Sequence, residues 1–141
     1  MEQHPLMLPL GNGQLSIPYV IKICNKRRTD YVVVRDIVYM VGREKTTTFH
    51  VCKQGQGPAL KPYVGGNNLG YYDEKYKSIF IRANQSIVFN PLYLAGVTNE
   101  RYLLLTCEHP PIYITDTYWP VVMKFLDSIL LPECVAEIGQ A

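Results

Sequence analysis

The chain has 141 residues, of which 48% are hydrophobic and 18% are charged, with a net charge of +2. This length fits one domain with its own core, and the composition excludes a disordered chain. No apolar run reaches the ~20 residues of a membrane span or forms a signal peptide. We therefore expect an intracellular protein, nuclear or cytoplasmic, with no membrane partner.

The charge is unevenly distributed along the chain. From Lys22 to Lys61 there are nine basic and three acidic residues, a net charge of +6, whereas from Pro62 onward the net charge is −3. A basic segment joined to an acidic one predicts either an anionic partner or a protein partner oriented by charge.

The N-terminal third begins with residues 1–13, which are rich in Pro and Gly and lack periodicity, so we expect a flexible arm before a single globular binding domain of residues 14–141. Residues 15–24 are β-branched and aromatic and predict a strand, with Pro18 at a sheet edge. Residues 25–30 predict a polar, basic turn.

Residues 32–55, "VVVRDIVYMVGREKTTTFHVCKQG", fit two structures. Their β-branched and aromatic residues favour two strands around the turn "GREK". The alternative is two short helices around Gly42, and in that form the 24 residues resemble the helix-turn-helix of lac-repressor-type regulators. The resemblance implies that Lys45, Thr46 and His50 face bases and that Lys53 meets phosphate. Arg43, Thr48, Phe49 and Val38 depart from that family's pattern.

The remaining chain predicts a sheet and a helix. Residues 53–58 and 64–70 are Gly-rich and predict loops. Short apolar runs at residues 77–83, 85–97, 101–108 and 112–115 predict strands, the third of them central. Residues 116–132 predict a helix that buries Val122, Phe125, Leu126, Ile129 and Leu130. We therefore expect an α+β fold, with an antiparallel or mixed sheet and a C-terminal amphipathic helix packed on it.

Two His/Cys pairs are candidate metal ligands. His50 and Cys52 stand two residues apart, as do Cys107 and His109, and residues at that spacing in a strand share a face. Together they would supply the Cys2His2 set of tetrahedral zinc. No motif of nucleophilic, metalloprotease or phosphate-loop chemistry occurs. We expect no enzymatic activity, and no cofactor other than this zinc site.

Our interpretation of these patterns is a non-enzymatic protein–protein interaction or assembly module of an intracellular regulatory or viral complex, binding another protein or itself. The alternative is a nucleic-acid-binding regulator that uses the basic segment 22–61, where Tyr19, Tyr31 and Tyr39 could stack on bases. The candidate contacts of that alternative are Lys22, Lys26, Arg27, Arg28, Arg43, Lys45, Thr46, His50 and Lys53.

Overall fold

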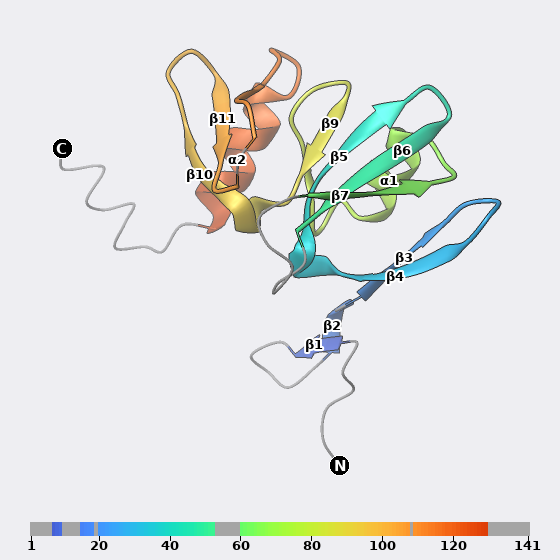
Figure 1. The fold of residues 1–141 in the computed structure, drawn as a ribbon. Helices are drawn as coiled ribbons and strands as arrows, with labels where there is room; N and C mark the ends of the chain where they lie inside the picture. The colour runs from blue at the N-terminus through green and yellow to red at the C-terminus, as the bar shows by residue number, and fades with distance from the viewer. Residues whose placement is uncertain (1–6, 10–14, 19, 53–59, 108, 130–141) are drawn as a thin grey trace.

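The computed structural model describes residues 7–9, 15–18, 20–52, 60–107 and 109–129 (Figure 1). The expected α+β fold, with antiparallel sheets and a C-terminal helix, is confirmed. The strands are β1 (Met7–Pro9), β2 (Leu15–Pro18), β3 (Val20–Cys24), β4 (Thr29–Val33), β5 (Ile37–Arg43), β6 (Thr46–Val51), β7 (Lys61–Gly65), β8 (Ile81–Arg82), β9 (Ile87–Phe89), β10 (Leu94–Val97), β11 (Tyr102–Leu105) and β12 (Ile112–Tyr113). The α-helices are α1 (Leu69–Lys75) and α2 (Trp119–Ile129), and the 3-10 turns are η1 (Val34–Asp36) and η2 (Pro91–Tyr93).

A five-stranded antiparallel sheet, ordered β7-β6-β5-β9-β8, forms the centre of the domain. A three-stranded sheet, β10-β11-β12, places β11 between its two neighbours, as predicted for this apolar run. The hairpins β3–β4 and β1–β2 pair separately, and β1 falls inside the segment expected as an arm.

The β interpretation of residues 32–55 is confirmed, and the helix-turn-helix interpretation is wrong. Strands β5 and β6 pair in register from Met40 opposite Phe49 to Arg43 opposite Thr46, with a two-residue turn between them. The run is dense in β-branched and aromatic residues, which lose side-chain freedom in a helix and pack well on a pleated sheet. The resemblance to lac-repressor-type regulators therefore carries no structural weight.

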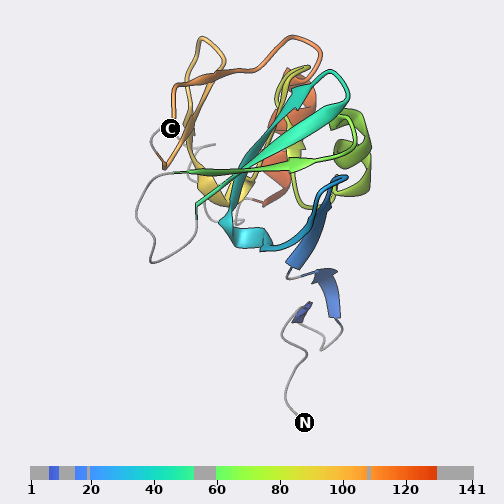
Figure 2. The same cartoon turned by 45° about the vertical axis from the view of Figure 1, so that its right-hand side comes forward.

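Each face of the central sheet buries a separate core, and the elements on either side of the sheet can be followed in Figure 2. On one face, Met40 and Phe49 pack with α1 and the β3–β4 hairpin. On the other face, Tyr39 and Phe89 pack with the β10-β11-β12 sheet and with Val122 of α2. The alternation of side chains along each strand lets one sheet serve both cores.

Helix α1 was missed because residues 64–70 look like a Gly-rich loop. The side chain of Asn68 caps the helix, accepting a hydrogen bond of 2.9 Å from the backbone N–H of Tyr71. Leu69, Tyr72 and Tyr76 then recur on the buried face. This cap and spacing were the available signal, and the adjacent glycines obscured it.

Two other expectations need correction. The strand predicted at residues 77–83 is only β8, and Ile79 and Ile81 pack in different cores instead of on one face. In α2, Phe125 and Leu126 pack on the core as expected, but Ile129 is 53% exposed because the helix ends there. Leu130 lies outside the described residues. None of the described helices is long and apolar enough to cross a bilayer.

Candidate nucleic-acid interface

The β3–β4 hairpin presents a basic outer face. Ile21 and Val32, which pair across the hairpin, turn inward and are buried in the first core. The next pair, Lys22 and Tyr31, therefore points outward, and Tyr31 is 71% exposed. The sequence pattern predicted this strand and its turn, and the structure confirms both.

The tip of this hairpin, residues 25–28, is held in place by one side chain. The Oδ1 atom of Asn25 accepts hydrogen bonds from the backbone N–H groups of Arg27 at 2.8 Å and Arg28 at 3.2 Å. Its Nδ2 atom donates to the carbonyl of Val64 in β7 at 2.7 Å. A backbone bond from Gly66 N–H to the carbonyl of Cys24, also 2.7 Å, adds a second attachment. The basic tip is thus fixed against the central sheet.

The fixed tip brings two basic segments together around one hollow. This basic hollow has a volume of about 440 Å³ and is lined by residues 25–28 together with Thr46, Val64 and Gly66. Thr46, the first residue of β6, thus lies beside residues about 20 positions earlier in the sequence, and Lys45 of the β5–β6 turn precedes it. Four predicted contacts, Lys26, Arg27, Arg28 and Thr46, line the basic hollow, while Arg43, the last residue of β5, lines a second hollow.

The cations in and next to these two segments carry unbalanced charge. Arg28 forms an ion pair with Asp30 at 2.7 Å. In the described parts of the chain, no ion pair is formed by four of these exposed cations, Lys26, Arg27, Arg43 and Lys45.

Three of the five basic residues from Pro62 onward are paired. Lys77 pairs with Glu74 at 2.8 Å, Arg82 pairs with Asp73 at 3.4 Å, and Arg101 pairs with Asp116, whereas Lys75 and Lys124 form no ion pair among the described residues. Lys26, Arg27, Arg43 and Lys45 thus leave a surplus of positive charge that Glu44 offsets in part.

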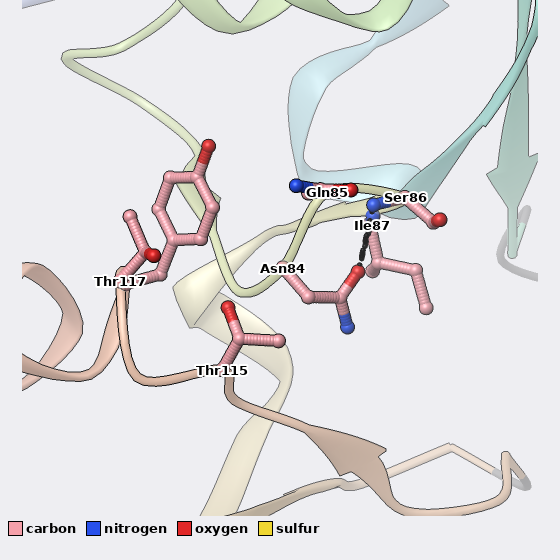
Figure 3. Close-up of a pocket in the computed structure, with 7 residues that line it drawn as sticks. Asn84, Gln85, Ser86, Ile87, Thr115 and Thr117 are labelled. Carbon is pink, nitrogen blue, oxygen red and sulfur yellow. Dashed lines mark hydrogen bonds between the residues drawn. The ribbon is translucent and has the colours of Figure 1, made fainter.

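Two further hollows are lined in part by turns of the central sheet. The second, of about 330 Å³, lies between the β5–β6 turn (Arg43), the start of α1 (Asn68) and the β8–β9 turn (Gln85 and Ser86). The third, of about 440 Å³, lies between that β8–β9 turn and the segment before α2, which supplies Thr115 and Thr117 (Figure 3). The second and third hollows share Gln85 and Ser86. We call the residues in and beside the three hollows the loop edge: 25–28, 43–46, 66–70, 84–86 and 115–118.

His50 and the other predicted zinc ligands line none of the three hollows. The ring of Tyr39 stacks on His50, with centroids 4.4 Å apart, and meets His109 edge-on at 4.3 Å. The two imidazoles thus contact an aromatic ring instead of converging on a common point. No group of three or more metal-ligating side chains occurs among the described residues, so the predicted zinc site does not assemble there.

The electrostatics of this cluster also favour neutral groups. Burial, then the neighbouring His109 and Arg43, lower the pKa of His50 below its ordinary value. Burial raises the pKa of the Cys107 thiol, which disfavours the thiolate form that binds zinc. Of the remaining predicted contacts, Lys22 lies on the outer face of β3, and Lys53 lies outside the described residues.

A second exposed surface is apolar and aromatic. On the outer face of the β10-β11-β12 sheet, Tyr102 of β11 lies opposite Tyr113 of β12, with ring centroids 5.4 Å apart. Leu104 is exposed two residues further along β11. These three side chains, which we call the tyrosine patch, are each more than a third exposed, and nothing in the described chain covers them. Exposed apolar patches of this kind mark interaction surfaces.

Comparison with known proteins identifies a similar fold but does not identify a family. No family model matches the chain, and no curated protein matches it. Among solved structures, the chain is similar to one described as the LytTr DNA-binding domain of a methyl-accepting/DNA response regulator from Bacillus cereus. The TM-score is 0.53 at 16% identity, and the match covers 77% of this chain and 96% of that one. The similarity is one of fold.

Proposed function

We propose that the chain is a nucleic-acid-binding module that contacts the phosphate backbone of duplex DNA through the loop edge. The observation that carries this proposal is the basic hollow, where two chain segments meet, together with four exposed cations in and next to these segments, Lys26, Arg27, Arg43 and Lys45, which form no ion pair among the described residues. Such cations neutralise phosphates and release condensed counterions. The fold similarity to a domain described as DNA-binding supports the same function. The proposal places the protein inside the cell and includes no catalysis or cofactor.

Duplex DNA fits this surface better than a single strand. Non-specific single-strand binding uses several exposed aromatic rings as stacking platforms. Of the three tyrosines expected to stack, Tyr39 is buried in the second core, Tyr19 lies outside the described residues, and Tyr31 is exposed. One exposed ring among these three does not make a platform, whereas exposed cations need only phosphates, which a duplex presents along both strands.

The test is fluorescence anisotropy with a labelled duplex at salt concentrations from 50 to 200 mM. If the four unpaired cations each neutralise one phosphate, the slope of log K against log salt is about −3.6, so the affinity falls about 100-fold over this range. The double charge reversal Arg27→Glu/Lys45→Glu should make the slope shallower, with a magnitude of about 2 or smaller, and should weaken binding at every salt concentration.

The matched control is Lys61→Glu/Lys124→Glu. Lys61 pairs with Val51 at the end of β7 away from the basic hollow, and Lys124 lies on α2; both are exposed. Both double variants change the net charge by the same amount. A loss of duplex affinity in the Arg27→Glu/Lys45→Glu variant alone would therefore identify the loop edge as the binding surface. Equal losses in both variants, or no salt-dependent binding by the unmodified protein, would contradict the proposal.

A second candidate function rests on the tyrosine patch. We propose protein–protein interaction through this sheet face, either by self-association or with another protein, since tyrosines at exposed sheet positions are frequent interface residues. Light scattering would report self-association, and Tyr102→Ser/Leu104→Ser should abolish any oligomer formed through the patch. An oligomer that persists unchanged in this variant would show that another surface is used.

A further inference from the structure

The third hollow differs chemically from the basic hollow. The segment before α2 faces the β8–β9 turn across it (Figure 3). Its lining supplies hydroxyl and amide groups and no charged side chain: Asn84, Gln85, Ser86, Thr115, Thr117 and Tyr118, with the apolar Ile87. Asp116 stands between the two threonines in sequence, but its carboxylate is paired with Arg101. Such uncharged donors can bind a phosphate oxygen but do not neutralise its charge, whereas a base edge, which presents paired donors and acceptors, finds partners of both kinds.

The β8–β9 turn is held rigid by its own neighbours. Arg82 donates from Nε to the carbonyl of Asn84 at 3.1 Å and from a terminal nitrogen to the carbonyl of Gln85 at 2.8 Å. The Oδ1 atom of Asn84 accepts from the N–H groups of Ser86 at 2.8 Å and Ile87 at 2.9 Å. Its Nδ2 atom donates to the carbonyl of Tyr113, also at 2.8 Å. The side chains of Arg82 and Asn84 are thus committed to holding the backbone.

Gln85 is the exposed member of this rigid turn. It lines both the second and the third hollow, and its side-chain amide has no hydrogen-bond partner within the described residues. Because the backbone of the turn is already fixed, binding by the Gln85 amide would cost the rotamer freedom of that side chain and no ordering of the turn. The side-chain amide of glutamine can pair in two places with the N6 and N7 atoms of adenine in the major groove.

We propose that Gln85 is a base-contacting residue that gives duplex binding its sequence preference, with the Ser86 and Thr117 hydroxyls beside it. This inference rests on the proposed function: the cations of the basic hollow hold phosphates, and the uncharged third hollow contacts base edges further along the same loop edge. Phosphate contacts set position and affinity but carry no sequence information. The basic hollow would therefore supply affinity, and the third hollow would supply sequence preference.

The experiment begins with selection of preferred sequences from a random duplex pool by the unmodified protein at physiological salt. Affinities for the selected duplex and for a scrambled duplex of equal length are then measured by anisotropy. Gln85→Leu should reduce the ratio of the two affinities about 5- to 150-fold, the range expected for one lost bidentate base contact. Affinity for the scrambled duplex and the salt slope should not change, and Gln85→Asn should restore part of the preference.

The matched control is Ser78→Ala, an exposed polar residue outside all three hollows. It should leave the affinity ratio unaltered. Failure of this inference differs from failure of the proposed function. If the protein binds both duplexes with a steep salt dependence but Gln85→Leu keeps the ratio, or if no sequence is enriched, the base-contact role is wrong while DNA binding stands. If the unmodified protein binds neither duplex even at low salt, both are wrong.

Discussion

Replacing Asn25 by alanine tests whether binding depends on the fixed position of the basic tip as well as on its charge. The substitution removes no charge, yet it deletes the two bonds that Oδ1 accepts within the tip and the one that Nδ2 donates to Val64. The cations of the tip remain but lose their attachment to β7. Binding that depends on a fixed array of cations should weaken, whereas binding through diffuse charge alone should be unaffected.

The expected loss of stability is modest. A typical intramolecular hydrogen bond contributes about 0.5–1.5 kcal/mol, and these bonds lie at an exposed site where water replaces the lost partners. We expect the free energy of unfolding to fall by about 1–2 kcal/mol, which for a domain of this size lowers Tm by roughly 3–8 °C. The backbone bond from Asn25 N–H to the carbonyl of Arg28 remains at 3.0 Å, so the hairpin itself should persist.

Two measurements on the same variant test this reasoning. Urea unfolding gives the change in stability, and anisotropy with a duplex gives affinity across the salt series. We expect Asn25→Ala to weaken duplex binding about 3- to 10-fold, equivalent to roughly 1 kcal/mol of lost pre-organisation, with the same salt slope as the unmodified protein.

Asn99→Ala serves as the control for stability, because Asn99 is an exposed amide whose side chain makes no hydrogen bond in the described chain. Equal unfolding free energies for Asn25→Ala and Asn99→Ala would refute the claim that Asn25 holds the tip. A reduced salt slope in Asn25→Ala would show instead that the substitution removes phosphate contacts outright.

Three other predictions concern the body of the domain. A Cβ added at Gly65 would lie 2.8 Å from Cζ of Tyr72, so Gly65→Ala should lower the free energy of unfolding by about 1–3 kcal/mol in urea titrations. Asn90 is buried, and its side-chain amide donates to two backbone carbonyls, so Asn90→Ala should lower the free energy of unfolding by about 2–4 kcal/mol. A decrease below about 1 kcal/mol would contradict the structural role of these hydrogen bonds. The pKa of His50 is lowered in the folded protein by burial and by His109, so the unfolded chain binds more protons. Stability should therefore be full above pH of about 6.5 and fall below it, and His50→Gln should flatten that dependence.

Local patterns predicted the strands well, because β-branched and aromatic residues decide strand formation within a few positions. The β5–β6 hairpin, the basic tip and the central position of β11 all follow from such runs. Helix α1 did not follow, since its cap, Asn68, sits among glycines that indicate a loop. The prediction of exposure was weaker at the end of α2, where Ile129 is exposed although it follows the predicted apolar spacing.

The candidate interface could be predicted only in part. The charge excess of residues 22–61 pointed to the cations of the hairpin tip, but the meeting of the tip with Thr46 depends on how β3, β6 and β7 pack in three dimensions. Nothing in the sequence marks Gln85, whose significance comes from the neighbouring hollows and from the bonds that Arg82 makes to its turn. The predicted zinc site illustrates the converse, since correct spacing within each pair does not ensure that ligands converge.

The strand order of the central sheet has a consequence for synthesis on the ribosome. Strands β5, β6 and β7 are joined by short-range pairings, but the other side of β5 pairs with β9, where Met40 lies opposite Val88. Until residue 88 has left the exit tunnel, a nascent chain that has formed the first hairpins exposes an apolar strand edge. In the interval between translation of β5 and translation of β9, this edge of β5 is therefore open to chaperone binding or to pairing with another nascent chain.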